Sequence, residues 1–348
     1  MNVNQFDTWL EFNGPVAVTL QEELEPVHGK GEVFFPPTFA PPEGDKSAPS
    51  YVIDSTSNGN VALIDTVGSQ ANRMEPIFKD SDYAELVPKG VVKIGDREVH
   101  ILDAGHRAAD AIVRFSDKWD ELRSAFLAIR DTRDAKPLAK IAPTSLVFGV
   151  WDSRDTQVKL PRLVGATIRA YGVEKLTRSA QFFSATEKEE THELASQDFL
   201  SQVGLDDAPA GRSEGGVISR EGIRRRAVLN LVALRALTSS NDEETKKVQR
   251  YILGLALVAL LAPSSRFLRE GCLLVPAEGT TADLRLVDRA GKREPLSLAE
   301  QEAAAFAKAA AKEFGVGEAW VATFNPESVK EAAAKKAEKK AQSKKAGK

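Results

Sequence analysis

One short stretch of the chain, Val61–Pro76, places an amide and a guanidinium at a sharp change of sequence pattern. Its first half is an apolar run with β-branched residues, which is typical of a buried strand, and its second half has apolar residues at helical spacing. If a helix begins with Ser69 as its N-cap, Gln70 and Arg73 share one face at its positive end. Such a corner presents backbone N–H groups, an amide and a guanidinium to a phosphate or an unpaired base edge.

The same corner also has a purely structural interpretation. Arg73 would pair with Asp65 or Glu75, while Gln70 and Asn72 would satisfy buried backbone groups. The motif alone does not decide between an anion site and an internal ion pair, and both interpretations remain open.

A second group of cations follows in residues 104–114. Arg107 and Arg114 are seven residues apart and align on one face of a predicted helix, where they could straddle phosphates. The alternative is a solvated helix face on which Arg114 pairs with Asp110 at i,i+4.

A third group lies between two predicted strands. Pro143–Trp151 has the pattern of a buried strand, and it opens into the polar turn Asp152–Thr156, where sites on sheets are common. Lys159–Tyr171 is predicted to be a second strand, on which Gly165, Thr167 and Arg169 share one face.

Charge is unevenly distributed after this strand. Residues 153–178 hold six basic side chains against two acidic, residues 186–211 hold one against seven, and residues 212–235 hold six against two. This pattern predicts an acidic excursion that leads away from a surface where the basic segments converge. Val217–Leu237 is predicted to be a helix with Arg220 and Arg224–Arg226 in its first turns, where cations oppose the helix dipole. A polyanionic partner would explain them; an exposed charged helix end is the alternative.

The composition limits the possible chemistry. The 348 residues have a formal charge of −3 and a pI near 6.0, so any anion-binding surface must be a local patch. The single Cys272 and four scattered histidines form no familiar metal-binding spacing. We expect no signal peptide, and the apolar run Tyr251–Ala262 is shorter than the roughly 20 residues that span a bilayer. These features favour a cytoplasmic protein without a metal or cofactor.

The chain is long enough for one large domain or two ordinary ones, and its pattern predicts further strands near 91–102, 283–288 and 320–324 and helices near 119–129 and 298–314. Two excursions are expected, a Pro-rich arm at about 29–50 and the acidic segment at about 186–216. Residues 326–348, with eight lysines against three glutamates, are predicted to be a solvated basic tail.

Five blocks of this sequence, taken together, resemble a known family. They are Leu63–Glu75, His106–Ala111, Pro143–Arg154, Lys159–Ala170 and Phe267–Cys272. In this order they resemble the repeated backbone subunit of the type I-G (formerly I-U) CRISPR surveillance complex, in the CRISPR-associated family-seven group of the RAMP superfamily.

The resemblance implies one α+β domain over residues 1–325, with a modified ferredoxin-like, RRM-type core and large insertions, described as palm, fingers and thumb. It also implies several copies stacked head to tail on one guide RNA, which pairs with target DNA. Further implied partners are the large subunit, the processing or cap subunits, and a helicase-nuclease recruited later, with no membrane. A guide of variable sequence must be held through its backbone, and the absence of paired RNP-style aromatics argues against base-specific recognition.

The candidate contacts to the RNA backbone are polar or cationic side chains from all of these segments. They are Ser69, Gln70, Asn72, Arg73, Arg107, Ser153, Arg154, Lys159, Arg162, Arg169, Arg220, Arg224 and Arg225.

Two other functions remain open. A RAMP ribonuclease acting on guide or target RNA would need a general acid or base, for which His106 and Asp155 are the candidates. The other is a protein-only assembly scaffold that uses the Pro-rich arm as a clasp between subunits. The leading hypothesis is a non-catalytic scaffold for guide RNA.

Overall fold

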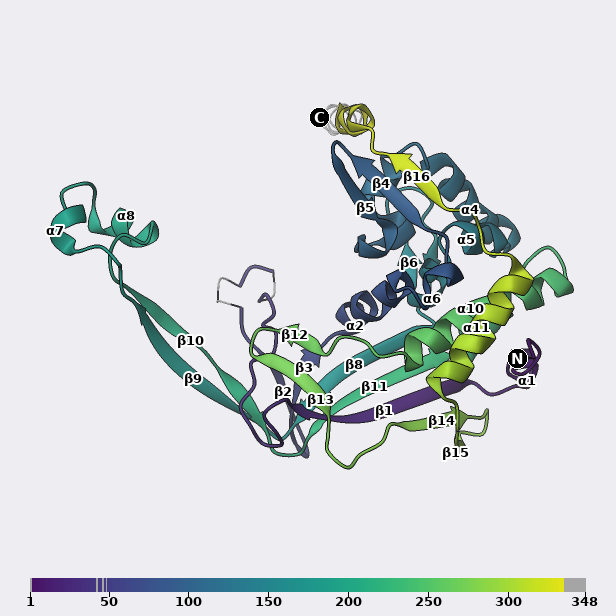
Figure 1. Ribbon diagram of the computed structural model, residues 1–348, viewed down its shortest axis with the longest axis horizontal. Helices are drawn as coiled ribbons and strands as arrows, with labels where there is room; N and C mark the ends of the chain where they lie inside the picture. Colours follow the sequence, from purple (N-terminus) through teal and green to yellow (C-terminus); the bar gives the residue numbers. More distant parts are fainter. Residues whose placement is uncertain (1, 42, 46, 48, 335–348) are drawn as a thin grey trace, which may run out of the picture.

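The computed structural model describes residues 2–41, 43–45, 47 and 49–334. Within these residues the largest element is a nine-stranded antiparallel sheet that curls beneath the helices (Figure 1). Its strands are β1 (Ala17–Pro26), β2 (Val52–Thr56), β3 (Gly59–Asp65), β8 (Val164–Tyr171), β11 (Ile223–Asn230), β12 (Phe267–Arg269), β13 (Cys272–Pro276), β14 (Asp283–Val287) and β15 (Arg293–Pro295). Their order is β12-β13-β1-β11-β8-β3-β2, with β14 paired to both β1 and β15. The predicted α+β class is confirmed, and the curled sheet is compatible with a RAMP-like core.

The smaller sheets are separate from this one. They are β4 (Gly90–Ile94), β5 (Arg97–His100) and β16 (Trp320–Thr323); β6 (Val150–Trp151) and β7 (Lys159–Leu160); and β9 (Val173–Phe182) and β10 (Ala208–Ser219). The hairpin of β9 and β10 projects from the body as an arm, and its far end carries α7 (Lys188–Thr191) and α8 (Gln197–Gln202) (Figure 1). The acidic excursion therefore does lead away from the body, as the charge pattern predicts.

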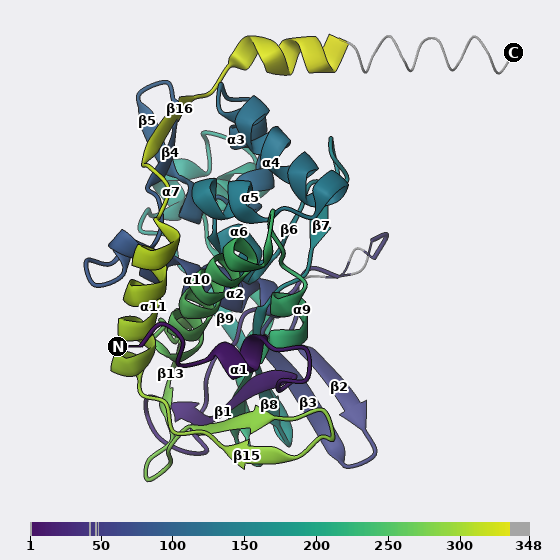
Figure 2. The ribbon, with the colours of Figure 1, turned by 90° about the vertical axis from the view of Figure 1, so that its right-hand side faces the viewer.

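One face of the large sheet is covered by helices, as Figure 2 shows for α2, α6, α10 and α11. The helices of the body are α1 (Asp7–Leu10), α2 (Val67–Met74), α3 (Ala111–Arg114), α4 (Trp119–Thr132), α5 (Lys136–Ile141), α6 (Thr144–Phe148), α9 (Leu231–Arg235), α10 (Asp242–Leu261) and α11 (Glu300–Phe314). In the described part of the chain they are joined by the 3₁₀ helices η1 (Glu75–Lys79), η2 (Ala84–Leu86), η3 (Ile101–Asp103) and η4 (Arg107–Ala109).

Alternation along the strands decides which side chains reach the open face of the sheet. In β8 the even-numbered residues from Val164 to Ala170 are buried, and the odd-numbered residues from Gly165 to Arg169 lie on the open face. The prediction that Gly165, Thr167 and Arg169 share a face is thus confirmed. In β11 the odd-numbered residues from Ile223 to Leu229 point inward in the same way.

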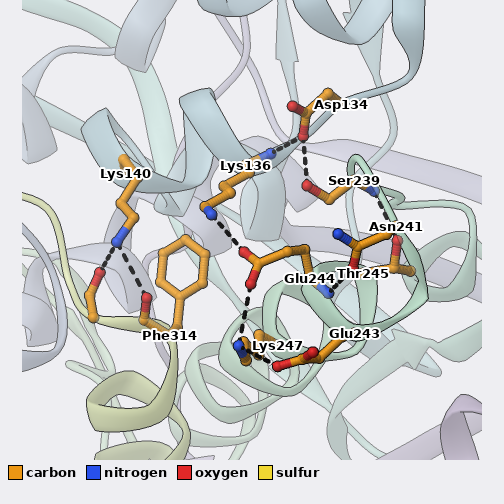
Figure 3. A network of polar contacts seen from close by, with 11 residues as sticks. Asp134, Lys136, Lys140, Ser239, Asn241, Glu243, Glu244, Thr245, Lys247 and Phe314 are labelled. Atoms are coloured by element: carbon orange, nitrogen blue, oxygen red, sulfur yellow. Dashed lines mark hydrogen bonds and ion pairs between the residues drawn. The ribbon is translucent and has the colours of Figure 1, made fainter.

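Polar contacts join α5, α10 and the loop between α9 and α10 (Figure 3). The Asp134 carboxylate accepts hydrogen bonds from the Ser239 hydroxyl at 2.8 Å and the Lys136 backbone N–H at 3.0 Å. Lys136 pairs with Glu244 of α10. The Lys140 ammonium donates to the carbonyl of Phe314 at 3.1 Å and lies over the Phe314 ring, so that α5 also contacts the end of α11. Burial lowers the pKa of Lys140, and the positive charge of Lys136 lowers it further.

Three predicted elements are wrong. Val217–Leu237 is not one helix but the end of β10, the strand β11 and the short helix α9, because the arginine-rich segment pairs with β1 and β8. Pro143–Trp151 is mostly the helix α6, with only its last two residues in β6. Residues 104–114 form η4 and α3, which are separated by the extended residue Asp110.

The start of α2 also differs from the prediction. The helix begins at Val67, and its N-cap is Thr66, whose hydroxyl accepts a hydrogen bond from the Ser69 backbone N–H at 3.1 Å. Ser69 therefore lies inside the first turn, and the strand β3 ends only one residue before the cap. The predicted strand-to-helix corner is confirmed, but its cap lies three residues earlier.

The described part of residues 29–50 has no helix, as its prolines predict. Phe34 is buried and pairs with Val217 of β10 in an isolated bridge. At the other end of the chain, residues 326–334 are helical, and the predicted tail from 335 onward lies outside the described residues. None of the helices that the structure describes is long and apolar enough to cross a bilayer.

The contact between α10 and α11 predicts a steric effect at Gly254. A Cβ atom at this position would lie 2.7 Å from Cα of Ala307, which is too close for an unshifted helix pair. We expect Gly254→Ala to lower the free energy of unfolding by about 1–3 kcal/mol, measured by urea denaturation. Gly68→Ala is the control, because its nearest neighbour would be 3.8 Å away, and it should raise stability by about 0.5–1 kcal/mol. Equal effects of the two substitutions would contradict the proposed clash.

Candidate nucleic-acid interface

A hollow of about 640 Å³ lies between residues 105–114 and residues 149–162. Its basic lining residues are His106, Arg107, Arg114, Arg154, Lys159 and Arg162. Among the described residues that line it there is no Asp or Glu. Five of the predicted contacts meet at this hollow, namely Arg107, Ser153, Arg154, Lys159 and Arg162.

The loop after β6 owes its shape to the buried carboxylate of Asp152. This carboxylate accepts hydrogen bonds from the Thr156 backbone N–H at 2.7 Å and the Thr156 hydroxyl at 2.8 Å. The backbone N–H groups of Arg154 and Asp155 donate to it at 3.3 Å. Burial by itself would raise the pKa of Asp152, but these hydrogen bonds lower it. The loop therefore holds the Arg154 side chain at the rim of the hollow, where it is exposed.

Arg107 forms the buried wall of the hollow. It has a positive φ of 52°, and its guanidinium donates to Glu75 at 2.6 Å. It also reaches the carbonyl of Gly149 at 3.4 Å and the side-chain oxygen of Asn72 at 3.5 Å. Burial raises the pKa of Glu75, and the charge of Arg107 opposes this shift. Because Glu75 already neutralises Arg107, the net positive charge of the hollow comes from its more exposed cations.

Trp151 also lines the hollow, and it was not among the predicted contacts. It lies opposite Lys159 in the two-residue ladder of β6 and β7, and the Lys159 ammonium is 5.2 Å from the centroid of its ring. Its side chain is 57% exposed. The sequence does place this aromatic residue directly before a polar turn. Because Pro143–Trp151 was predicted to be a buried strand, however, Trp151 was expected to be buried.

Gln70 and Arg225 are buried and Arg73 is half-buried, and none of the three lines the hollow. The amide of Gln70 donates to Asp65 at 2.6 Å and accepts from Arg225 at 3.0 Å. Arg225 pairs with Glu22 at 2.6 Å. Arg73 donates to Asp65 at 3.0 Å and to the carbonyls of residues 267 and 268 at 2.9 and 3.0 Å. The structural alternative for Arg73, an ion pair with Asp65, is confirmed.

The open face of the sheet holds a second group of predicted residues. Arg169 and Arg224 are direct cross-strand neighbours on β8 and β11. Arg224 pairs with Glu23 at 3.1 Å and lies 4.7 Å from the centroid of the Tyr171 ring, whereas Arg169 bonds to Thr167 at 3.3 Å.

Beside these residues is a groove of about 730 Å³. Its charged lining residues are Arg226, Asp283, Arg285 and Arg293, of which none was predicted. Another predicted residue, Arg220, lies at the base of the arm and forms a two-bond pair with Glu174 at 2.7 and 3.0 Å. The structure thus divides the predicted contacts among the hollow, the interior, the open sheet face and the arm.

Helix α2 connects the two cationic surfaces. The side chain of Asn72 is exposed and bonds to Arg107 at the hollow, while Val67 lies beside Gly165 on the open sheet face. Val67 and Asn72 are five residues apart, so α2 joins the two surfaces over about 7.5 Å along its axis. Ser69 is half-buried on the same helix, and its hydroxyl accepts from Thr66 at 3.1 Å.

The two candidate catalytic side chains have different surroundings. One carboxylate oxygen of Asp155 accepts from Arg123 at 2.8 Å and from the Trp119 indole at 3.2 Å. His106 lines the hollow, and its backbone N–H donates to Asp110 at 3.1 Å. Among the described residues no three His, Cys, Asp or Glu side chains are placed to hold a metal ion.

Fold and site together define a curled-sheet α+β protein with a local cationic surface. Residues 18–175 match the model of the family described as CRISPR-associated protein GSU0053 (Cas_GSU0053). The matched residues include α2, β8 and the whole hollow. A comparison with curated proteins finds no match. The match covers 158 of the 348 residues and shows a similarity to CRISPR-associated proteins over this part of the chain.

The buried position of Arg225 predicts a large effect on stability. We expect Arg225→Ala to lower the free energy of unfolding by about 1–3 kcal/mol, because Glu22 loses one of its two arginine partners and the buried Gln70 amide loses its donor. The adjacent Arg226 is exposed on the other face of β11, so Arg226→Ala should change stability by no more than about 0.5 kcal/mol. Denaturant unfolding of both variants measures the difference, and similar losses would contradict the assignment.

Proposed function

We propose that the protein is the repeated backbone subunit of a type I CRISPR surveillance complex, of the I-G kind that its motifs resemble. It would hold guide RNA through the ribose-phosphate chain, without regard to sequence, and present it to target DNA. The observation that carries this proposal is the hollow, which is lined by six basic residues and no described carboxylate. The similarity to a CRISPR-associated family supports the choice of RNA as the polyanion.

Backbone contacts suit this role because they give affinity without reading bases. The proposed track follows the hollow, the exposed side of α2 and the open face of the sheet. Its accessible cations are Arg154, Lys159, Arg162 and Arg169. We assign Gln70, Arg73 and Arg225 to positioning α2 rather than to direct contact, since each is engaged inside the protein.

The complex would contain several copies of this chain together with large and processing subunits. We propose that the projecting arm of β9 and β10 is the thumb of the resembled family, because it extends furthest from the body (Figure 1). A helicase-nuclease would act later on the paired target DNA, which the subunit itself reaches only through the guide.

Salt dependence tests the proposed track. Arg154→Ala should weaken binding to single-stranded RNA and reduce the slope of log affinity against log salt by about 0.7 to 1 unit, because one released counterion is lost. Arg130→Ala is the matched control, since it removes an exposed cation on α4 that does not line the hollow. Fluorescence anisotropy at several salt concentrations measures both quantities. An unchanged slope for Arg154→Ala would contradict the site.

The proposal also excludes cleavage of RNA by this subunit. Labelled precursor and target RNA incubated with the purified protein, with and without divalent metal, should remain intact. Asp155→Ala should instead reduce stability, because Arg123 and Trp119 lose their shared acceptor. A cleavage product that disappears in His106→Ala would favour the ribonuclease. Oligomers purified without bound RNA would favour the protein-only scaffold.

A further inference from the structure

Trp151 differs from the other tryptophans of the chain in its surroundings. Trp9, Trp119 and Trp320 are 7%, 9% and 8% exposed, whereas Trp151 is 57% exposed. The indole N–H groups of Trp119 and Trp320 donate to Asp155 and to the carbonyl of Ile141, respectively. The indole N–H groups of Trp151 and Trp9 have no hydrogen bond to the residues that the structure describes, so its exposure is what distinguishes Trp151.

The backbone around Trp151 is fixed although its ring is exposed. Val150 and Asp152, the residues on either side, are both buried, and Asp152 holds the following loop through four hydrogen bonds. A single exposed apolar residue needs no explanation by itself. Here, however, a rigid segment holds a large aromatic ring in a hollow whose charged lining residues are basic.

The neighbouring cations match the two parts of a nucleotide. Lys159 lies over the indole ring, while Arg154 and Arg162 line the same hollow. Single-stranded nucleic acids are commonly held by cations along the backbone together with aromatic rings on which bases stack. The basic side chains of a protein segment would find no acidic partner among the described lining residues, whereas the phosphates of a nucleic acid would meet cations around the ring.

We propose that Trp151 is a stacking platform for one unpaired base of a single-stranded nucleic acid bound in the hollow. Lys159 then moves from the ring to a phosphate. Every base has a π-face, so the platform accepts any base and preserves binding that is independent of sequence. This inference rests on the proposed function and adds a contact that phosphate binding alone does not require.

The exposed tryptophan also provides its own spectroscopic signal. Full-length protein freed of RNA is titrated with oligouridine, with oligoadenosine and with an abasic ribose-phosphate oligomer of equal length. Both base-containing oligomers should quench the exposed fraction of tryptophan fluorescence, and the abasic oligomer should not. Trp151→Phe should abolish this quenching while binding oligouridine within about threefold of the unsubstituted protein, because phenylalanine still stacks.

Trp151→Leu separates stacking from apolar burial. It should weaken oligouridine binding by about 5- to 150-fold with an unchanged salt slope, and it should bind the abasic oligomer like the unsubstituted protein. Equal affinity of Trp151→Leu and unsubstituted protein for oligouridine would overturn the stacking proposal, as would an equal loss with the abasic oligomer. In either case a reduced slope for Arg154→Ala would leave the proposed function standing. If no oligomer binds the unsubstituted protein, the proposed function fails as well.

Discussion

The structure depends on a set of buried charges that separates two apolar clusters. On β1, Leu20 belongs to one cluster and Leu24 to the other, with Glu22 between them. Glu22 pairs with Arg225, which in turn bonds to Gln70 of α2. Buried charges are costly unless they are paired, and a set of this kind tolerates few alternative arrangements. The helix α2 therefore has one favourable position on the sheet.

That position determines where the cationic surfaces lie. With Gln70 and Arg73 directed inward, the outward side of α2 presents Asn72 next to the hollow, and its first residue, Val67, lies beside Gly165. The interior ion pairs thus contribute to the interface without touching a ligand. A protein with a net charge of −3 can present such a surface because many of its acidic groups are paired elsewhere.

Strand register gives three consecutive arginines three different environments. Arg225 points into the interior, whereas Arg224 pairs with Glu23 and Arg226 bonds to Gln21 on the opposite face. A helix would have spread these side chains around its surface. Because successive side chains of a strand alternate between faces, the basic cluster of the sequence is not a single patch.

The sequence by itself determined the α+β class through the resemblance of its motifs, and the corner after β3, the shared face of β8 and the helices α4 and α11 follow from local periodicity and turn residues. It also indicated the cations around Ser153–Arg162, because a polar turn after an apolar segment is a local signal. Only the tertiary structure decided that 217–230 is paired strand rather than helix, that Arg73 and Arg225 form ion pairs within the protein, and that Trp151 is exposed. These outcomes depend on partners such as Glu22 and Asp65 and on pairing between distant strands, and no local pattern specifies which distant residues meet.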